Sequence, residues 1–112
     1  MAPEPRLRAG IWVAAYLARL RLAAIPAFVV ARGDDTAGAV LVVVSTLDGR
    51  SVARQRSFDL LTGERAWVVL AEGTDAEVAE AVARQRRFDP DLWVIEVEDR
   101  EGRSLLDEEG HG

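Results

Sequence analysis

The chain has 112 residues, of which 49% are hydrophobic and 29% charged, a composition that fits one globular domain. It contains no cysteine, which excludes disulfides, thiolate metal sites and a cysteine nucleophile and favours a reducing, cytoplasmic setting. All fourteen basic residues are arginine, so lysine-based catalysis is excluded, and the net charge of -5 argues against a general nucleic-acid binder.

The two ends of the chain are expected to lie outside the folded part. Residues 1–8 contain two prolines and no periodic pattern, so we predict a flexible lead. The apolar stretch after them is interrupted by Arg19 and Arg21, which argues against a secretion signal or a membrane span. Residues 107–112 form an acidic tail that we expect to be disordered, which leaves a single domain over residues 9–106.

Residues 10–24 carry the spacing of an amphipathic helix, and Pro26 ends it. Ile11 and Leu22 fall on its otherwise polar or small side. Placed at 100° steps, five apolar side chains share the opposite face: Trp12, Val13, Tyr16, Leu17 and Leu20.

Two strands, at residues 27–32 and 39–47, should follow as a hairpin around the turn at Gly33. Both are apolar on both faces, so we expect them in the middle of a sheet covered on each side, or in a closed or dimeric sheet. Asp48 and Gly49 then form a hairpin turn that leads into a third strand at residues 51–58.

A near-repeat makes this third strand ambiguous. Residues 52–59 (VARQRSFD) and 82–89 (VARQRRFD) match at seven of eight positions, so residues 52–58 could be strand or helix. Because a turn signal precedes the first copy, we predict that it is a strand and that the match is coincidental.

After a loop at residues 59–64, residues 65–72 read as a fourth strand. Thr74 and Glu77 form a capping box that starts a second helix, and Glu80 and Arg84 are spaced for an ion pair on it. Its apolar face is predicted to carry Val78, Ala81, Val82, Gln85 and Phe88. Gln85 is the polar member of that face, and we expect it to tether the helix to neighbouring backbone groups rather than to bind a ligand.

Residues 92–99 form the fifth strand. Trp93, Ile95 and Val97 make one face apolar, while the opposite face becomes acidic beyond Val94. The order α-β-β-β-β-α-β predicts an α+β domain with a mostly antiparallel sheet of about five strands and both helices packed on it. The neighbour of the fifth strand stays open: it could pair beside the first strand or run parallel to the fourth.

The chain resembles a family of small bacterial proteins catalogued only as a domain of unknown function. The resemblance lies in three stretches, GIWVAAYLARLR, AGAVLVVVSTLDG and RQRRFDPDLWVIEVEDREGR. It implies a bacterial cytoplasmic setting and assigns no activity, cofactor or catalytic residue.

The carboxylates around residues 89–99 are the only candidates for binding a hard cation or for acid-base chemistry: Asp89, Asp91, Glu96, Glu98 and Asp99. The alternative is structural, since Asp89 and Asp91 suit the turn around Pro90 and the glutamates suit a solvated strand end. We favour the structural alternative and predict no catalytic, metal or cofactor-binding residue.

Histidine, arginine and tryptophan are the other residue types that could serve a function. The sole histidine, His111, lies in the predicted tail and is a poor candidate for catalysis. The arginines could form a phosphate-binding surface, but helical spacing separates them and acidic neighbours offset them: Arg84, Arg86 and Arg87, with Arg54 and Arg56. The three tryptophans sit on apolar faces, and we expect at least two of them to meet in the core.

The sequence therefore favours a small non-catalytic cytoplasmic protein that acts through contact with a protein partner or with itself as a homodimer. A divalent-metal-dependent enzyme or ligand binder using residues 89–99 is the alternative, and nucleic-acid binding through the arginines is the third hypothesis.

Overall fold

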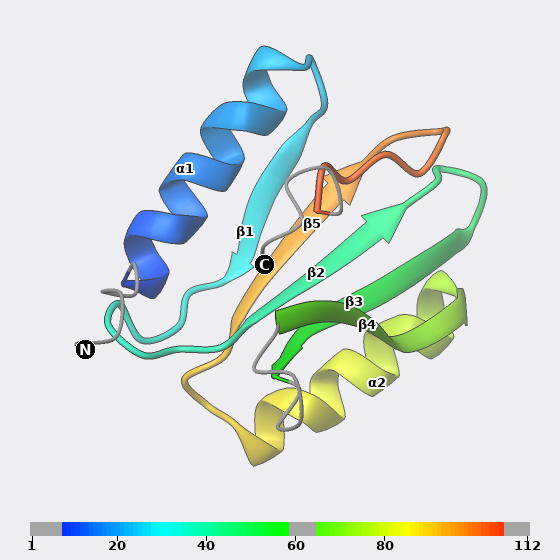
Figure 1. Cartoon of the computed structure of the whole chain (residues 1–112). Helices are drawn as coiled ribbons and strands as arrows, with labels where there is room; N and C mark the ends of the chain where they lie inside the picture. Colours follow the sequence, from blue (N-terminus) through cyan, green and yellow to red (C-terminus); the bar gives the residue numbers. More distant parts are fainter. Residues whose placement is uncertain (1–7, 59–64, 107–112) are drawn as a thin grey trace.

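A computed structural model describes residues 8–58 and 65–106, which form two helices and a five-stranded sheet (Figure 1). The helices are α1 (Ala9–Leu22) and α2 (Asp75–Phe88). The strands are β1 (Ala27–Ala31), β2 (Val40–Ser45), β3 (Arg50–Phe58), β4 (Arg65–Thr74) and β5 (Trp93–Glu98). The predicted α+β class and element order are confirmed. The expected loop at residues 59–64, the N-terminal lead and the acidic tail lie outside the described residues.

The strand order in the sheet is β1-β5-β2-β3-β4, so the last strand lies between the first two. The predicted hairpin of β1 and β2 is therefore wrong. β5 pairs antiparallel with β1 and parallel with β2, while β2, β3 and β4 form an antiparallel meander. The physical reason is that Trp93, Ile95 and Val97 on one face of β5 and Val94 on the other are all buried, so the strand stabilises the sheet best from the middle.

This order also corrects the expected position of β1. β2 lies in the middle of the sheet and its residues 40–42 are buried, as predicted. β1 is instead an edge strand, and its three central side chains, Phe28, Val29 and Val30, are exposed. An apolar run on both faces thus did not distinguish a central strand from an edge strand.

The helices lie on opposite faces of the sheet (Figure 1), so each face has its own core. Under α1, the buried face contains Val13, Tyr16 and Leu20 of the helix and the inward residues of β2 and β5: Val40, Val42, Val44, Trp93, Ile95 and Val97. Under α2, Val78 and Val82 pack on a second set: Ala31, Leu41, Ala53, Leu92 and Val94.

The predicted faces of both helices are confirmed with one exception. On α1 the exposed side chains include Ile11 and Leu22, as expected. On α2 the capping box and the pair of Glu80 with Arg84 are both present. Phe88, however, is 86% exposed rather than buried, because the helix ends at this residue and the chain turns away at Asp89.

The near-repeat adopts two different structures. Residues 52–58 lie in β3, whereas residues 82–88 lie in α2, so the predicted strand is confirmed. The predicted meeting of tryptophans is also confirmed: the ring centroids of Trp12 and Trp67 are 5.5 Å apart, and Tyr16 stacks on Trp12 at 4.9 Å.

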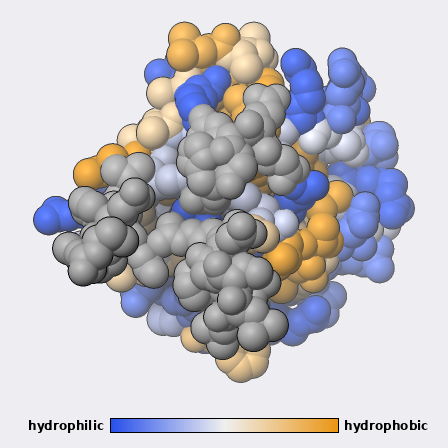
Figure 2. All heavy atoms as spheres, in the orientation of Figure 1, coloured by the Kyte–Doolittle hydropathy of each residue, from blue (hydrophilic) through white to orange (hydrophobic). Residues whose placement is uncertain are grey.

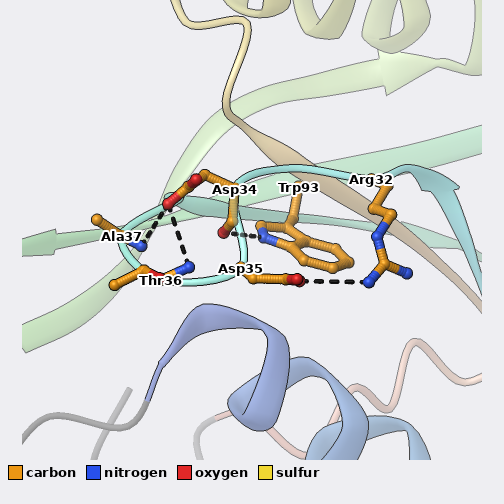
Figure 3. Close-up of polar contacts among 6 residues, drawn as sticks. All are labelled: Arg32, Asp34, Asp35, Thr36, Ala37 and Trp93. Carbon is orange, nitrogen blue, oxygen red and sulfur yellow. Dashed lines mark hydrogen bonds and ion pairs between the residues drawn. The ribbon is translucent and has the colours of Figure 1, made fainter.

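The loop between β1 and β2 ties three elements together (Figure 3). The Asp34 carboxylate accepts hydrogen bonds from the backbone N–H groups of Thr36 and Ala37, and the Asp34 carbonyl accepts one from the Trp93 indole at 2.8 Å. The N-terminus of α1 has no side-chain cap, but the Gly10 N–H donates to the Asp35 carbonyl of this loop. The loop therefore positions both α1 and the start of β5.

Within the described residues, neither helix has the length and apolar character needed to cross a membrane.

Tyr16 provides a pH test of the α1 core. Its hydroxyl donates to the Ser104 carbonyl at 2.7 Å, and burial raises the pKa of the phenol well above its ordinary value although Arg19 and Arg54 oppose the rise. Above about pH 10 the unfolded phenol ionises first, so the free energy of unfolding should fall by up to about 1.4 kcal/mol per pH unit. Tyr16→Phe should lack this slope and be about 1 kcal/mol less stable at neutral pH.

Urea unfolding across this pH range measures the slope. Because Tyr16 is the only tyrosine, absorbance at the phenolate band reports its ionisation directly. Phenolate that forms near pH 10 in the folded protein would contradict the predicted shift.

Gly33 is expected to tolerate no side chain. A Cβ atom at this position would lie 2.3 Å from the Asp91 carbonyl oxygen and 2.7 Å from the Trp93 nitrogen, both backbone atoms that hold β5 in place. Gly33→Ala should therefore lower the free energy of unfolding by about 1–3 kcal/mol or more in chemical denaturation. Thr36→Ala, an exposed change in the same loop, should stay within about 0.5 kcal/mol of the parent protein, and equal effects of the two would refute the steric argument.

Candidate functional site

A groove of about 610 Å³ lies between α2 and the sheet, and we call it the α2 groove. Its wall is formed by α2, through Asp75, Val78, Ala79, Val82, Ala83 and Arg86. Its floor is formed by β1, β2, β3 and β5 and by the turn after β2, through Val30, Val43, Ser45, Leu47, Gly49, Ser51, Val94, Glu96 and Glu98.

The groove exists because α2 covers only part of its face of the sheet. The helix packs mainly over β3 and β4, and the core beneath it reaches β5 only as far as Val94. Beyond Val94 the same face continues as Glu96 and Glu98, which are half-buried. The sequence predicts that this face of β5 becomes acidic beyond Val94, and the change occurs where α2 no longer covers the strand.

The carboxylates in the groove differ in their partners. Asp75 accepts a hydrogen bond from the Ser51 hydroxyl, and its backbone N–H donates to the Gly49 carbonyl at 2.9 Å, so it anchors the start of α2 to β3. The side chains of Glu96 and Glu98 take part in none of the hydrogen bonds or ion pairs found among residues 8–58 and 65–106. The groove thus carries two carboxylates that no described side chain neutralises.

The surroundings of Glu96 in the groove shift its pKa. Burial raises its pKa above the ordinary value, and the negative charges of Glu98 and Asp75 raise it further. Among the described residues that line the groove, Arg86 is the single cation against three carboxylates. The α2 groove is consequently an apolar surface with excess negative charge at one end.

The five acidic residues predicted as a possible site do not converge. Asp89 and Asp91 precede β5, whereas Glu96, Glu98 and Asp99 lie at its other end, roughly 17 Å farther along an extended strand. No group of three or more His, Asp or Glu side chains in the described part of the chain is arranged to hold a metal ion.

Asp89 and Asp99 have local structural partners. The Asp89 carboxylate accepts a hydrogen bond from the Asp91 N–H at 3.1 Å, within the turn around Pro90. Asp99 is paired with Arg103, whose guanidinium donates to Asp99 Oδ1 at 2.9 Å, and this hydrogen bond holds the pKa of Asp99 below its usual range. These two carboxylates stabilise the turns on either side of β5.

Gln85 is half-buried on α2, and its side chain forms no hydrogen bond within the ranges that the structure describes. Its backbone carbonyl accepts from the Asp89 N–H at 3.0 Å, which closes the last turn of the helix. The expected side-chain tether therefore has no counterpart among the described contacts.

The arginines considered for phosphate binding lie on opposite faces of the sheet. Arg86 lines the α2 groove, and Arg84 pairs with Glu80 on the outer side of α2. Arg54 pairs across the sheet with Val42 on the α1 face, where Arg56 also lies over the rings of Trp12 and Trp67. These residues cannot form one continuous basic surface, and His111 lies outside the described residues.

The sequence indicated Glu96 and Glu98 as candidate site residues. It did not indicate that Asp75, Val30 and the α2 residues of the wall line the same groove. Asp75 lies in the first turn of α2, where an acidic side chain already has a sufficient local role. Its position beside β5 depends on how α2 crosses the sheet, and no local pattern in the chain carries that information.

Comparison with known proteins identifies relatives over nearly the whole chain. A family model described as "Protein of unknown function (DUF1491)" matches residues 7–107, and no curated protein matches. A crystal structure of a DUF1491 family protein from Caulobacter crescentus CB15 has 36% identity and a TM-score of 0.82, with 91% of this chain and 96% of that chain covered. An NMR structure of a DUF1491 family protein from the same organism has 37% identity and a TM-score of 0.80, with 93% of this chain and 96% of that chain covered. A solution structure of a protein from A. tumefaciens has 30% identity and a TM-score of 0.74, with 91% of this chain and 93% of that chain covered.

The electrostatics of the α2 groove can be tested at Glu96. Glu98→Gln removes one of the negative charges that raise the pKa of Glu96, so that pKa should move down toward its ordinary value while the contribution of burial remains. Titration of the side-chain carboxyl carbon by NMR measures it. Glu101→Gln, an exposed change in the turn after β5, should leave the Glu96 pKa unchanged, and an equal response to both variants would contradict a local interaction.

Proposed function

The chain belongs to the DUF1491 family, and we propose that it is a small non-catalytic protein that acts through protein–protein contact, with the open edge of β1 as the contact surface and a second copy of the chain as the partner. The family and its solved members carry no description of an activity, so the proposal rests on the geometry of this chain.

The observation that carries the proposal is the exposed apolar edge at β1. This strand ends the sheet, and its central residues Phe28, Val29 and Val30 are 46%, 39% and 54% exposed. Its outer backbone groups are available to pair with another strand, a common route to association. Figure 2 shows exposed apolar residues, in orange, among hydrophilic ones on the face turned toward the viewer.

A second copy suits this edge for two reasons. First, the five residues of β1, AFVVA, carry no charge, so two copies can pair antiparallel about Val29 without repulsion in the strand. Second, such pairing obeys the twofold symmetry of most homodimers and would cover side chains that are exposed in the single chain. It would also account for a strand that is apolar on both faces and yet lies at an edge.

The setting supported by composition is the cytoplasm, because the chain has no cysteine to form the disulfides typical of exported small domains. The separated carboxylates of residues 89–99 give no support to a metal-dependent reaction as a second function.

Size-exclusion chromatography with light scattering tests the proposal. The 12.2 kDa chain should elute as a dimer that dissociates on dilution, and Val29→Lys should shift it to the monomer because a lysine on an edge strand opposes pairing. Val69→Lys, at a similarly exposed valine of β4 on the opposite edge of the sheet, is the matched control and should remain dimeric. A parent protein that stays monomeric at its highest soluble concentration, or that loses the dimer equally in both variants, would refute the β1 contact.

A further inference from the structure

We propose that the α2 groove is a docking site for a segment of a partner protein in which apolar side chains alternate with arginine or lysine. This site uses the face of the sheet beside α2, whereas the β1 contact uses the outer backbone groups of that strand; the two surfaces adjoin at Phe28 and Val30.

The shape of the groove and its apolar surface suit a peptide segment. Its volume of about 610 Å³ lies within the range of natural binding clefts. On the floor, Val30 and Leu47 are exposed and Val43 is half-buried. On the wall, Ala79 and Ala83 are exposed, so apolar side chains of a bound segment would leave water for an apolar surface. Phe28, which pairs with Glu96 across the sheet and is exposed, extends this surface toward β1.

The charge of the groove selects a basic segment. Glu96 and Glu98 have no ion pair with any described residue, and Asp75 adds a third negative charge beside them. Arg86 supplies one positive charge at the wall. A bound arginine or lysine would pair with these half-buried carboxylates and offset the cost that burial imposes on Glu96.

The spacing of the two glutamates selects an extended segment with alternation. Glu96 and Glu98 are two residues apart on one strand, so their side chains leave the same face about 7 Å apart. Basic residues at positions i and i+2 of an extended peptide have the same separation, and the residues between them point the other way. The residues at i and i+2 diverge on a helix, so basic residues with this alternating pattern match the two glutamates only in an extended segment.

Two other occupants fit less well. A metal ion lacks a third converging ligand among the described side chains. A second copy of the chain carries a net charge of -5 and would bring further negative charge toward the glutamates, whereas it has an uncharged strand to offer at the β1 edge.

The probe is the peptide acetyl-VRVRV-amide, labelled with a fluorophore and titrated with the full-length protein in an anisotropy assay. Two matched peptides separate the contributions: acetyl-VEVEV-amide reverses the charge, and acetyl-SRSRS-amide removes the apolar side chains. We expect saturable binding of the first peptide and at least about tenfold weaker binding of each of the others, with affinity for the first falling as salt is raised.

Variants of the protein locate the site. The double change Glu96→Gln with Glu98→Gln should weaken binding of acetyl-VRVRV-amide roughly tenfold, because each partly exposed ion pair contributes up to about fivefold. The control is Glu72→Gln with Glu101→Gln, which removes the same charge from exposed positions outside the groove and should change affinity less than about twofold. Amide shifts in the NMR spectrum should map to Val94, Glu96 and the groove side of α2.

The outcomes are decisive in both directions. Equal binding of acetyl-SRSRS-amide, equal loss in the control variant, shifts confined to other surfaces, or no binding of acetyl-VRVRV-amide would each overturn the inference. The dimer measurement is independent of all of these, since a groove that binds no peptide leaves the light-scattering result for β1 unchanged.

Discussion

β5 is hydrogen-bonded between β1 and β2, and most of the fold depends on this placement. One face of the strand, with Trp93, Ile95 and Val97, completes the core under α1, while Val94 on the other face completes the core under α2. A single six-residue strand therefore joins two cores that share no helix. β5 also makes the strand pairings between residues that are farthest apart in the sequence, because Ile95 pairs with Val29 on one side and with Val42 on the other.

The position of β5 has consequences for both surfaces that we connect with function. Because β5 occupies the place beside β2, β1 is displaced to the edge with one side of its backbone unpaired. Because α2 starts directly after β4 and packs over β3 and β4, it leaves the end of β5 uncovered. The open β1 edge and the α2 groove thus arise from the same topology. Neither surface requires a special sequence motif, which explains why no motif in the chain predicted the β1 edge or the α2 groove.

Partial burial without a hydrogen-bond or ion-pair partner among the described side chains distinguishes Glu96 and Glu98 from Asp89 and Asp99. Asp89 and Asp99 accept hydrogen bonds within turns, and each stabilises the local backbone. The two glutamates lie on a sheet face whose preceding residues are fully buried, yet they form no contact with an opposite charge in the described structure. Burial without a partner raises the pKa of Glu96, because it disfavours the charged carboxylate. A ligand that supplied positive charge would stabilise the carboxylate and lower this pKa again.

The sequence by itself determined every element whose cause is local: the face of α1 that carries Val13 and Tyr16, the Asp48-Gly49 turn, the capping box at Thr74, and the alternation along β5. It even separated the two copies of the near-repeat, since a turn precedes one and a helix cap precedes the other. Only the tertiary structure decided the strand order, the edge position of β1 and the joining of Asp75 with Glu96 in one groove. These depend on pairing between residues far apart in the chain, and an apolar strand is equally apolar beside any neighbour, so its pattern cannot specify which one it joins.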